Sequence, residues 1–178
     1  MPRYIALLRA VNVGGTGVLP MAELKGMCVA AGFGRVETYV ASGNVVFDTN
    51  AAAARVKAEL EARLLAYARK PVGVVVRTAA EMAEVLAANP FTRTEPSYTY
   101  VIFLDVRPPR DALDHAVGIN GEKMVLGKRE IYVHYPSGMG GSRLRIPAAK
   151  AGTARNLNTV AKLAELAAAR VERGRRLG

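Results

Sequence analysis

The densest group of chemically useful side chains lies at residues 155–159, which hold an arginine, two asparagines and a threonine. The guanidinium of Arg155 can hold a phosphate or carboxylate through two parallel hydrogen bonds. Asn156 and Asn158 can add amide contacts to the same ligand. An asparagine at the start of a helix can instead cap free backbone N–H groups, so a structural interpretation stays open. The segment predicts contact between Arg155 and an anionic ligand.

A glycine-rich loop at residues 136–142 precedes this segment, and it ends in Ser142 and Arg143. Glycine lets the backbone approach a ligand closely, and the hydroxyl and guanidinium beside it supply hydrogen-bond donors. We therefore expect Ser142 and Arg143 to share a ligand pocket with Arg155.

A second glycine-rich loop, residues 12–17, follows an apolar run near the N-terminus and contains Asn12, Gly14 and Gly15. A helix that begins near Pro20 places positive backbone groups close to this loop, which favours an anion. Tight turns that need a positive φ explain the same glycines without any ligand. The loop lacks the Gly-Lys-Ser/Thr of a phosphate-binding Walker loop and the spacing of a dinucleotide fingerprint.

The order of predicted elements places a hairpin beside this loop. Residues 42–44 read Ser-Gly-Asn between two apolar runs, a typical hairpin turn. In the predicted sheet, the loop after the first strand and this hairpin lie at the same end. Arg9, inside the first strand, is then close to Ser42 and Asn44. We expect these side chains to contact the anionic ligand as well.

The sequence offers few residues for a metal site or a catalytic site. His115 and His134 lie far apart in the chain, and no pair of potential metal ligands has ligand spacing, so we expect neither a metal nor a cofactor. Cys28 falls on an apolar helical face and is expected in the core. His134 could act as a general base, but no neighbouring acid or nucleophile completes a triad. No catalytic residue is assigned, and whether the protein is an enzyme stays open.

The elements that must position these residues predict an α+β protein. Residues 1–78 read strand-helix-strand-strand-helix-strand, the order of a ferredoxin-like sandwich, and residues 79–178 form a second α+β subdomain packed into one body with the first. Strands are expected at residues 3–11, 36–41, 45–48, 72–77, 98–104, 123–126 and 130–135. Helices are expected from Pro20 and at residues 51–68, 79–88, 109–117 and 157–171.

The charge and composition of the chain indicate which classes of partner it can bind. The chain of 178 residues carries a net charge of +10 with an isoelectric point near 10.1, and nine Lys or Arg residues stand against two acidic ones from Arg143 onward. This charge raises the expectation of an anionic partner, although a basic solvated tail explains it equally. Apolar runs are too short to cross a bilayer, no secretory signal is present at the N-terminus, and only one cysteine occurs. We expect a cytoplasmic protein that does not contact membranes.

Several segments together resemble a known bacterial family. They are YIALLRAVNVGG (4–15), MAEL (21–24), SGNVVF (42–47), NPF (89–91), IYVHYP (131–136) and TARNLNTVAKL (153–163). The chain resembles the family identified as domain of unknown function 1697 over nearly its whole length. The resemblance implies an α+β fold of two subdomains and no established activity. Ala10, Arg143 and Leu157 stand where that family usually has glycine, lysine and tryptophan.

Three functions follow from these patterns. The favoured hypothesis is a protein that binds, and potentially transforms, a small phosphorylated or carboxylated molecule. The second is an RNA- or DNA-binding module that uses the basic C-terminal third, although aromatic residues for base stacking are few. The third is a non-enzymatic interaction domain that uses an open sheet face. Neither the identity of the ligand nor the oligomeric state follows from the sequence.

Overall fold

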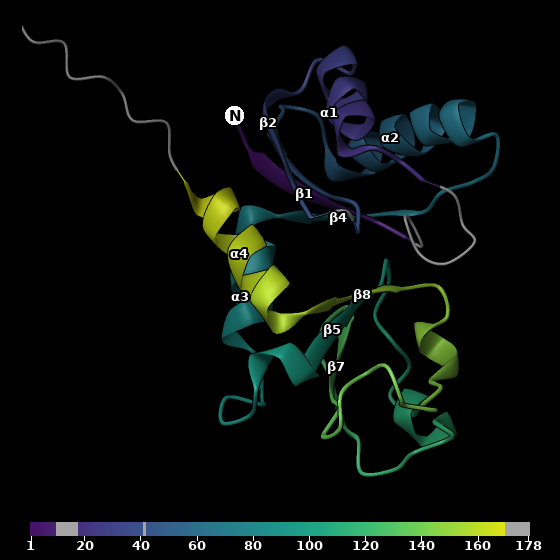
Figure 1. Ribbon diagram of the computed structural model, residues 1–178. Helices are drawn as coiled ribbons and strands as arrows, with labels where there is room; N and C mark the ends of the chain where they lie inside the picture. The colour runs from purple at the N-terminus through teal and green to yellow at the C-terminus, as the bar shows by residue number, and fades with distance from the viewer. Residues whose placement is uncertain (10–17, 41, 170–178) are drawn as a thin grey trace, which may run out of the picture.

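The computed structural model describes residues 1–9, 18–40 and 42–169 and shows an α+β protein with two four-stranded antiparallel sheets (Figure 1). The first sheet contains β1 (Arg3–Leu8), β2 (Gly34–Tyr39), β3 (Asn44–Asp48) and β4 (Val74–Thr78) in the order β2-β3-β1-β4. Together with α1 (Met21–Ala30) and α2 (Ala53–Ala68), these strands follow the element order predicted for residues 1–78. Asn12, Gly14 and Gly15 lie outside the described residues.

The helices α1 and α2 cover one face of the first sheet. Along β1, side chains alternate between the two faces, and Tyr4, Ala6 and Leu8 pack toward these helices. Val56, Leu60 and Leu64 recur at helical spacing and form the buried side of α2. Tyr67 lies at the end of the helix and is 45% exposed.

Two further helices lie between the sheets, α3 (Ala79–Ala87) and α4 (Leu157–Ala168) (Figure 1). Thr78 begins α3 with a capping box, in which its hydroxyl accepts from the backbone N–H of Glu81 and the Glu81 carboxylate accepts from the backbone N–H of Thr78. Buried residues of both sheets pack against these helices in one apolar cluster: Ile5, Leu7, Val46, Val75, Met82, Val85, Val101, Phe103, Tyr132, Val160, Leu163 and Ala167.

This central cluster changes one expectation. The second face of the first sheet, predicted to be open for interactions, is buried against α3 and α4, because the strand residues Ile5 and Leu7 are apolar on that side too. The aromatic rings Tyr4 and Phe47 belong to the opposite face and stack within its core. Among the described residues, neither face of this sheet is therefore left open as a platform.

The second sheet contains β5 (Thr99–Phe103), β6 (Lys123–Leu126), β7 (Glu130–His134) and β8 (Thr153–Asn156) in the order β6-β7-β5-β8. The strand β8 was not predicted, because its sequence Thr-Ala-Arg-Asn lacks the apolar residues that identify a strand. The expected helix at residues 109–117 is only a short 3₁₀ turn, Ala112–His115.

The remaining face of the second sheet is covered by short irregular elements, including the 3₁₀ helices Ala112–His115 and Pro147–Ala149. No helix in the described part of the chain is long and apolar enough to span a bilayer. The α+β class is confirmed, and the apolar core between the sheets takes residues from both predicted subdomains.

Candidate functional site

Arg155 lies on β8 at the junction of the two halves, and it is 6% exposed. Its side chain reaches the end of β1 and the β2–β3 hairpin. Its Nε donates to Asn44 Oδ1 (2.6 Å), Nη1 to Thr153 Oγ1 (2.6 Å) and the Ala154 carbonyl (2.9 Å), and Nη2 to the carbonyls of Leu8 (2.8 Å) and Ser42 (3.0 Å). All three guanidinium nitrogens of Arg155 therefore donate to oxygens of the protein.

The oxygens around Arg155 are all neutral. No carboxylate of residues 1–9, 18–40 or 42–169 forms a salt bridge with it. Burial alone lowers the pKa of Arg155 to about 10, and no acidic group opposes that shift. The guanidinium stays protonated at neutral pH, so a full positive charge lies at the junction, and none of the described carboxylates pairs with it.

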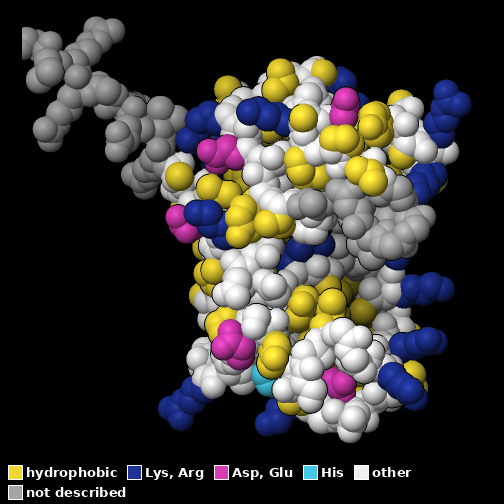
Figure 2. Space-filling model, in the orientation of Figure 1, with side chains coloured by type: hydrophobic (Ala, Val, Ile, Leu, Met, Phe, Trp, Pro, Cys, Tyr) yellow, Lys and Arg dark blue, Asp and Glu magenta, His cyan; other side chains and the backbone are white. Residues whose placement is uncertain are grey.

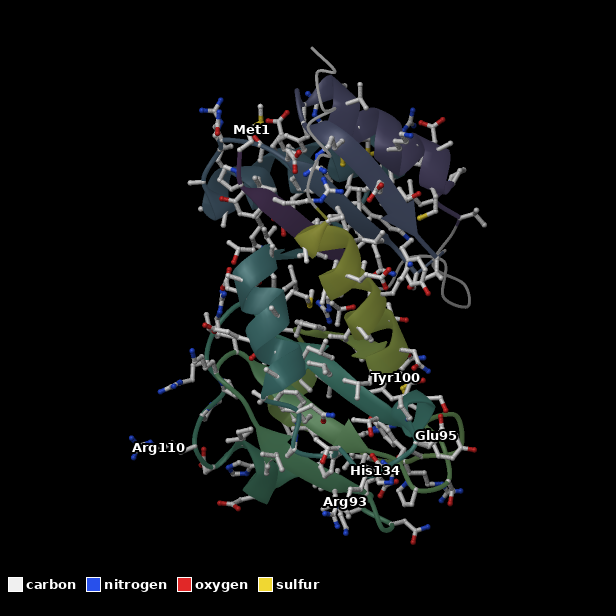
Figure 3. All side chains as sticks on the ribbon, turned by 90° about the vertical axis from the view of Figure 1, so that its left-hand side faces the viewer. Met1, Arg93, Glu95, Tyr100, Arg110 and His134 are labelled. Carbon is white, nitrogen blue, oxygen red and sulfur yellow. The ribbon has the colours of Figure 1, made fainter. Side chains whose placement is uncertain are left out.

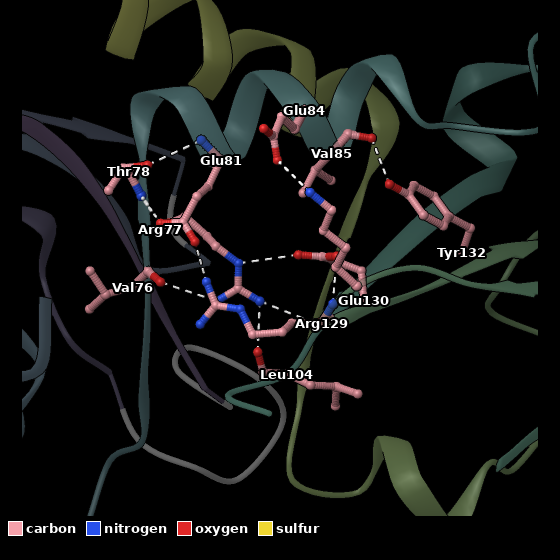
Figure 4. A network of polar contacts seen from close by, with 11 residues as sticks. Val76, Arg77, Thr78, Glu81, Glu84, Val85, Leu104, Arg129, Glu130 and Tyr132 are labelled. Carbon is pink, nitrogen blue, oxygen red and sulfur yellow. Dashed lines mark hydrogen bonds and ion pairs between the residues drawn. The ribbon is translucent and has the colours of Figure 1, made fainter. Parts of the chain in front are cut away.

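A second buried arginine shows the contrasting arrangement. Arg77, at the end of β4, is 1% exposed, and its Nε donates to Glu130 of β7 at 3.2 Å (Figure 4). Its Nη2 also donates to the carbonyls of Leu104 (2.6 Å) and Arg129 (3.1 Å). Both arginines join the two halves, but within the described part of the chain only Arg77 does so with a carboxylate partner. The two halves can thus be joined by an arginine that has a carboxylate partner, so joining them does not explain why Arg155 lacks one among the described residues.

Arg9 follows β1 and lies beside the segment that leads into β8. Its backbone N–H donates to the Gly73 carbonyl (2.9 Å), its Nε donates to the Gly152 carbonyl (3.1 Å), and its Nη2 donates to the Lys150 carbonyl. Arg9 and Lys150 are both exposed. The junction thus combines one buried and two exposed basic residues next to the end of β1.

The β2–β3 hairpin positions Arg155. The Asn44 side chain is fully buried and donates to the Tyr39 carbonyl (2.8 Å) and Ser42 Oγ (3.0 Å), which turns its Oδ1 toward Arg155. Gly43 has a φ of +84°, and a Cβ there would lie 2.8 Å from Leu8 Cβ. The hairpin lies beside the end of β1, where the Leu8 N–H donates to the Gly43 carbonyl (2.8 Å), but the Arg9 side chain contacts Lys150 and Gly152 instead. The roles of Asn44 and Gly43 are structural.

Ser142 and Arg143 lie elsewhere. They line a pocket of about 380 Å³ on the second subdomain, formed by residues 118–122 and 136–143. Ser142 Oγ donates to Glu122 Oε1 (2.7 Å), and this bond is the largest influence holding the pKa of Glu122 below its usual value. The lining of this pocket includes neither Arg9 nor Arg155. The structure therefore does not bring the two predicted clusters into one pocket.

Asn156 and Asn158 have different surroundings. Asn156 is the N-cap of α4, and its Oδ1 accepts from the Thr159 backbone N–H at 2.9 Å, while Asn158 is exposed. We expect Asn156→Ala to lower the free energy of unfolding by about 1 kcal/mol, because an N–H at the helix start loses its acceptor. The matched Asn158→Ala variant should change it by less than about 0.5 kcal/mol. Urea unfolding of both variants measures the difference, and equal losses would contradict a capping role.

Cys28 is a residue of α1 and is buried in the core, and this burial raises the pKa of its thiol to about 12. We expect the native protein not to react with a thiol reagent such as dithionitrobenzoate at pH 8 on the timescale of minutes. The unfolded protein should react at once with one equivalent. Fast reaction of the folded protein would show that the helix opens readily.

No group of three or more potential metal ligands occurs among the described residues.

Sequence reasoning missed Arg77, Glu130 and Lys150. A signal was present for Arg77, since an arginine directly after Val74–Val76 interrupts a strand that is otherwise buried on both sides. A buried strand carries an arginine only where the charge finds acceptors. Lys150 gave no signal, because its position depends on the path of residues 147–152 across the end of β1.

Figure 2 shows Lys and Arg side chains at several separate places on one face of the molecule. Such a distribution identifies no single basic groove on this face. The buried charge at Arg155, together with Arg9, is a more specific feature than these scattered surface charges.

Comparisons with known proteins identify a family and a fold. Residues 1–132 match the family model described as protein of unknown function (DUF1697). No curated protein matches the chain. Among solved structures, a conserved bacterial protein from Streptococcus pneumoniae has a TM-score of 0.77 at 23% identity, over 94% of this chain and 98% of that one. At that identity the likeness shows the fold alone. With the family model spanning most of its length, the chain belongs to the DUF1697 family of proteins of unknown function.

Proposed function

We propose that this protein binds a small anionic ligand, phosphorylated or carboxylated, beside the end of β1 at Arg9 and Arg155. The observation that supports the proposal is the buried guanidinium of Arg155, which has neutral acceptors but no carboxylate partner among the described residues. A buried charge is costly unless an opposite charge lies near it. A bound anion supplies that opposite charge.

The two arginines have different roles in this proposal. Arg155 has its donors occupied by protein oxygens, so it attracts the anion through its electric field rather than through direct hydrogen bonds. The field acts strongly because the surroundings of Arg155 are buried. Direct contact comes from exposed groups such as Arg9, whose guanidinium donates to the carbonyls of residues 150 and 152 in the segment that leads into β8.

The sequence of the neighbouring loop is consistent with the same proposal. Residues 10–17 contain no aspartate or glutamate, so this segment adds no negative charge that could serve as a partner for Arg155. The protein groups around Arg155 are carbonyls, one amide and one hydroxyl, which suit binding and positioning. The proposal therefore concerns binding, and it assigns no reaction.

Thermal unfolding tests the proposal with inorganic phosphate, sugar phosphates, nucleotides, small carboxylates and short RNA. A ligand present at a hundred times its Kd stabilises the native state by about 2.7 kcal/mol, which raises Tm by roughly 5–10 °C for a chain of this length. We expect such a shift with at least one small anion in the native protein. Arg9→Gln is the informative variant, because Arg9 is exposed and its loss should leave the fold intact.

The matched control is Arg110→Gln, which removes the same charge from an exposed residue on the second subdomain (Figure 3). The anion-dependent shift should fall in Arg9→Gln and persist in Arg110→Gln. Equal shifts in both variants, or no shift with any small anion, would contradict the proposal. A shift with RNA alone that declines steeply with salt would indicate a nucleic-acid ligand instead.

A further inference from the structure

A further concave site lies beside the buried Arg77–Glu130 pair, since Glu130 is among its lining residues. It is a pocket of about 420 Å³ between the C-terminal half of α3 and the turn that joins β6 to β7 (Figure 4). Val85, Ala87 and Ala88 line it from the helix, and Gly127 and Tyr132 line it from the hairpin. Its volume falls in the range of pockets that bind small molecules.

The polar side chains of the described residues that line this pocket already have partners. The Tyr132 hydroxyl donates to the Val85 carbonyl at 2.7 Å, so the phenol is already paired. Burial raises the pKa of Tyr132 to about 12, and the ring stays neutral at physiological pH. Among the described residues, every buried side-chain nitrogen and oxygen has a hydrogen-bond partner. A ligand in this pocket meets aliphatic carbon of Ala87 and Ala88, and the Tyr132 ring, 2% exposed, lies beneath it.

The rim is charged but balanced. Lys128 Nζ lies 3.2 Å from Glu84 Oε2, and Arg129 forms an ion pair with Glu81 (Figure 4). Each pair joins the hairpin turn to α3 across the edge of the pocket. Beneath them, Glu130 is neutralised by Arg77. A charged ligand would have to break one of these pairs, whereas an uncharged ligand can enter without doing so.

We propose that this pocket between α3 and the β6–β7 turn binds an uncharged, mainly apolar small molecule. The ligand packs on Ala87, Ala88 and Gly127, with Val85 and Tyr132 buried beneath them and the aliphatic stems of Lys128 and Arg129 at its side. This site is independent of the proposed anion site, because the two share no residue and have opposite electrostatic requirements. Failure of one proposal leaves the other unaffected.

Two dyes with the same ring skeleton separate the possibilities. N-phenyl-1-naphthylamine is uncharged, and 8-anilinonaphthalene-1-sulfonate adds one negative charge to it. Both fluoresce more strongly in an apolar site. We expect the native protein to bind one equivalent of the uncharged dye saturably, and to bind the sulfonate at this pocket about tenfold more weakly, since the cations of the rim are already paired. Equal or tighter binding of the sulfonate here would overturn the proposed ligand class.

Pocket-filling variants locate the dye. Ala88→Trp places a large ring at the pocket edge and should weaken binding of the uncharged dye by about tenfold or more. Ala87→Trp serves as the second variant if Ala88→Trp unfolds, as judged by circular dichroism. The control is Val29→Trp, a 57% exposed position on α1 of the first subdomain, which should change dye affinity by less than about twofold.

Each outcome of the dye-binding measurements supports or overturns the proposal. Loss of dye binding in the pocket variants and retention in Val29→Trp would support the proposal. Absence of saturable binding, or unchanged binding in Ala88→Trp, would overturn it. A native protein that dimerises in sedimentation and becomes monomeric in Ala88→Trp would show that a second copy occupies the pocket, which would overturn it as well.

Discussion

Replacing Arg77 with alanine is expected to lower the free energy of unfolding by about 3–5 kcal/mol, because it leaves Glu130 buried without its partner. The side chains of Arg77 and Glu130 are 1% and 6% exposed, so water does not replace the lost contact. The variant also leaves the carbonyls of Leu104 and Arg129 without the donor at Arg77 Nη2. Urea unfolding followed by circular dichroism measures the change.

Two controls separate the buried pair from the loss of an arginine in general. Arg110→Ala removes an exposed arginine and should change stability by less than about 0.5 kcal/mol. The double variant Arg77→Met with Glu130→Met removes both charges together and should be more stable than Arg77→Ala alone. A double variant that is less stable than the single one would show that the charges stabilise the fold beyond their mutual pairing.

Replacing Arg155 with alanine is expected to destabilise the protein by a similar amount, about 3–5 kcal/mol, for a different reason. No charge is left unpaired, but Asn44 Oδ1, Thr153 Oγ1 and the Leu8 carbonyl each lose a donor in a buried place. Arg155→Lys keeps the charge but supplies one nitrogen instead of three, and it should recover only part of the loss.

The same two variants distinguish a structural role from an electrostatic one. If Arg155 only joins the halves, small anions should stabilise Arg155→Lys and Arg155→Met equally. Under the proposed function, the anion-dependent rise in Tm persists in Arg155→Lys, which keeps the positive charge, and declines in Arg155→Met. Measuring Tm for both variants with and without phosphate gives this comparison without relying on their absolute stabilities.

The first half of the fold follows from the sequence because its local signals agree with one another. The apolar run of β1, the Ser-Gly-Asn hairpin at residues 42–44 and the helical spacing of Val56, Leu60 and Leu64 each predict the element that is present. The boundaries differ by one to three residues where these elements are fully described, as is usual for patterns that fade at the ends of elements.

The second half depends more on contacts between distant residues. The strand β8 has a polar sequence and pairs with β5 only because the chain returns along the edge of that sheet. Arg155 was identified as a residue of interest, but its burial and its neutral partners depend on the β2–β3 hairpin, more than a hundred positions earlier. No local pattern could have placed Ser142 and Arg143 in a separate pocket from Arg155.

The position of α4 between the sheets bears on how the chain is made. This helix follows every other described element in the sequence, yet it covers apolar residues of the first sheet such as Ile5 and Val46. During translation these residues have left the ribosome long before residues 157–168 are available to cover them. Chaperones recognise such exposed apolar strands in incomplete chains. The nascent protein is thus vulnerable to aggregation while α4 is still being synthesised.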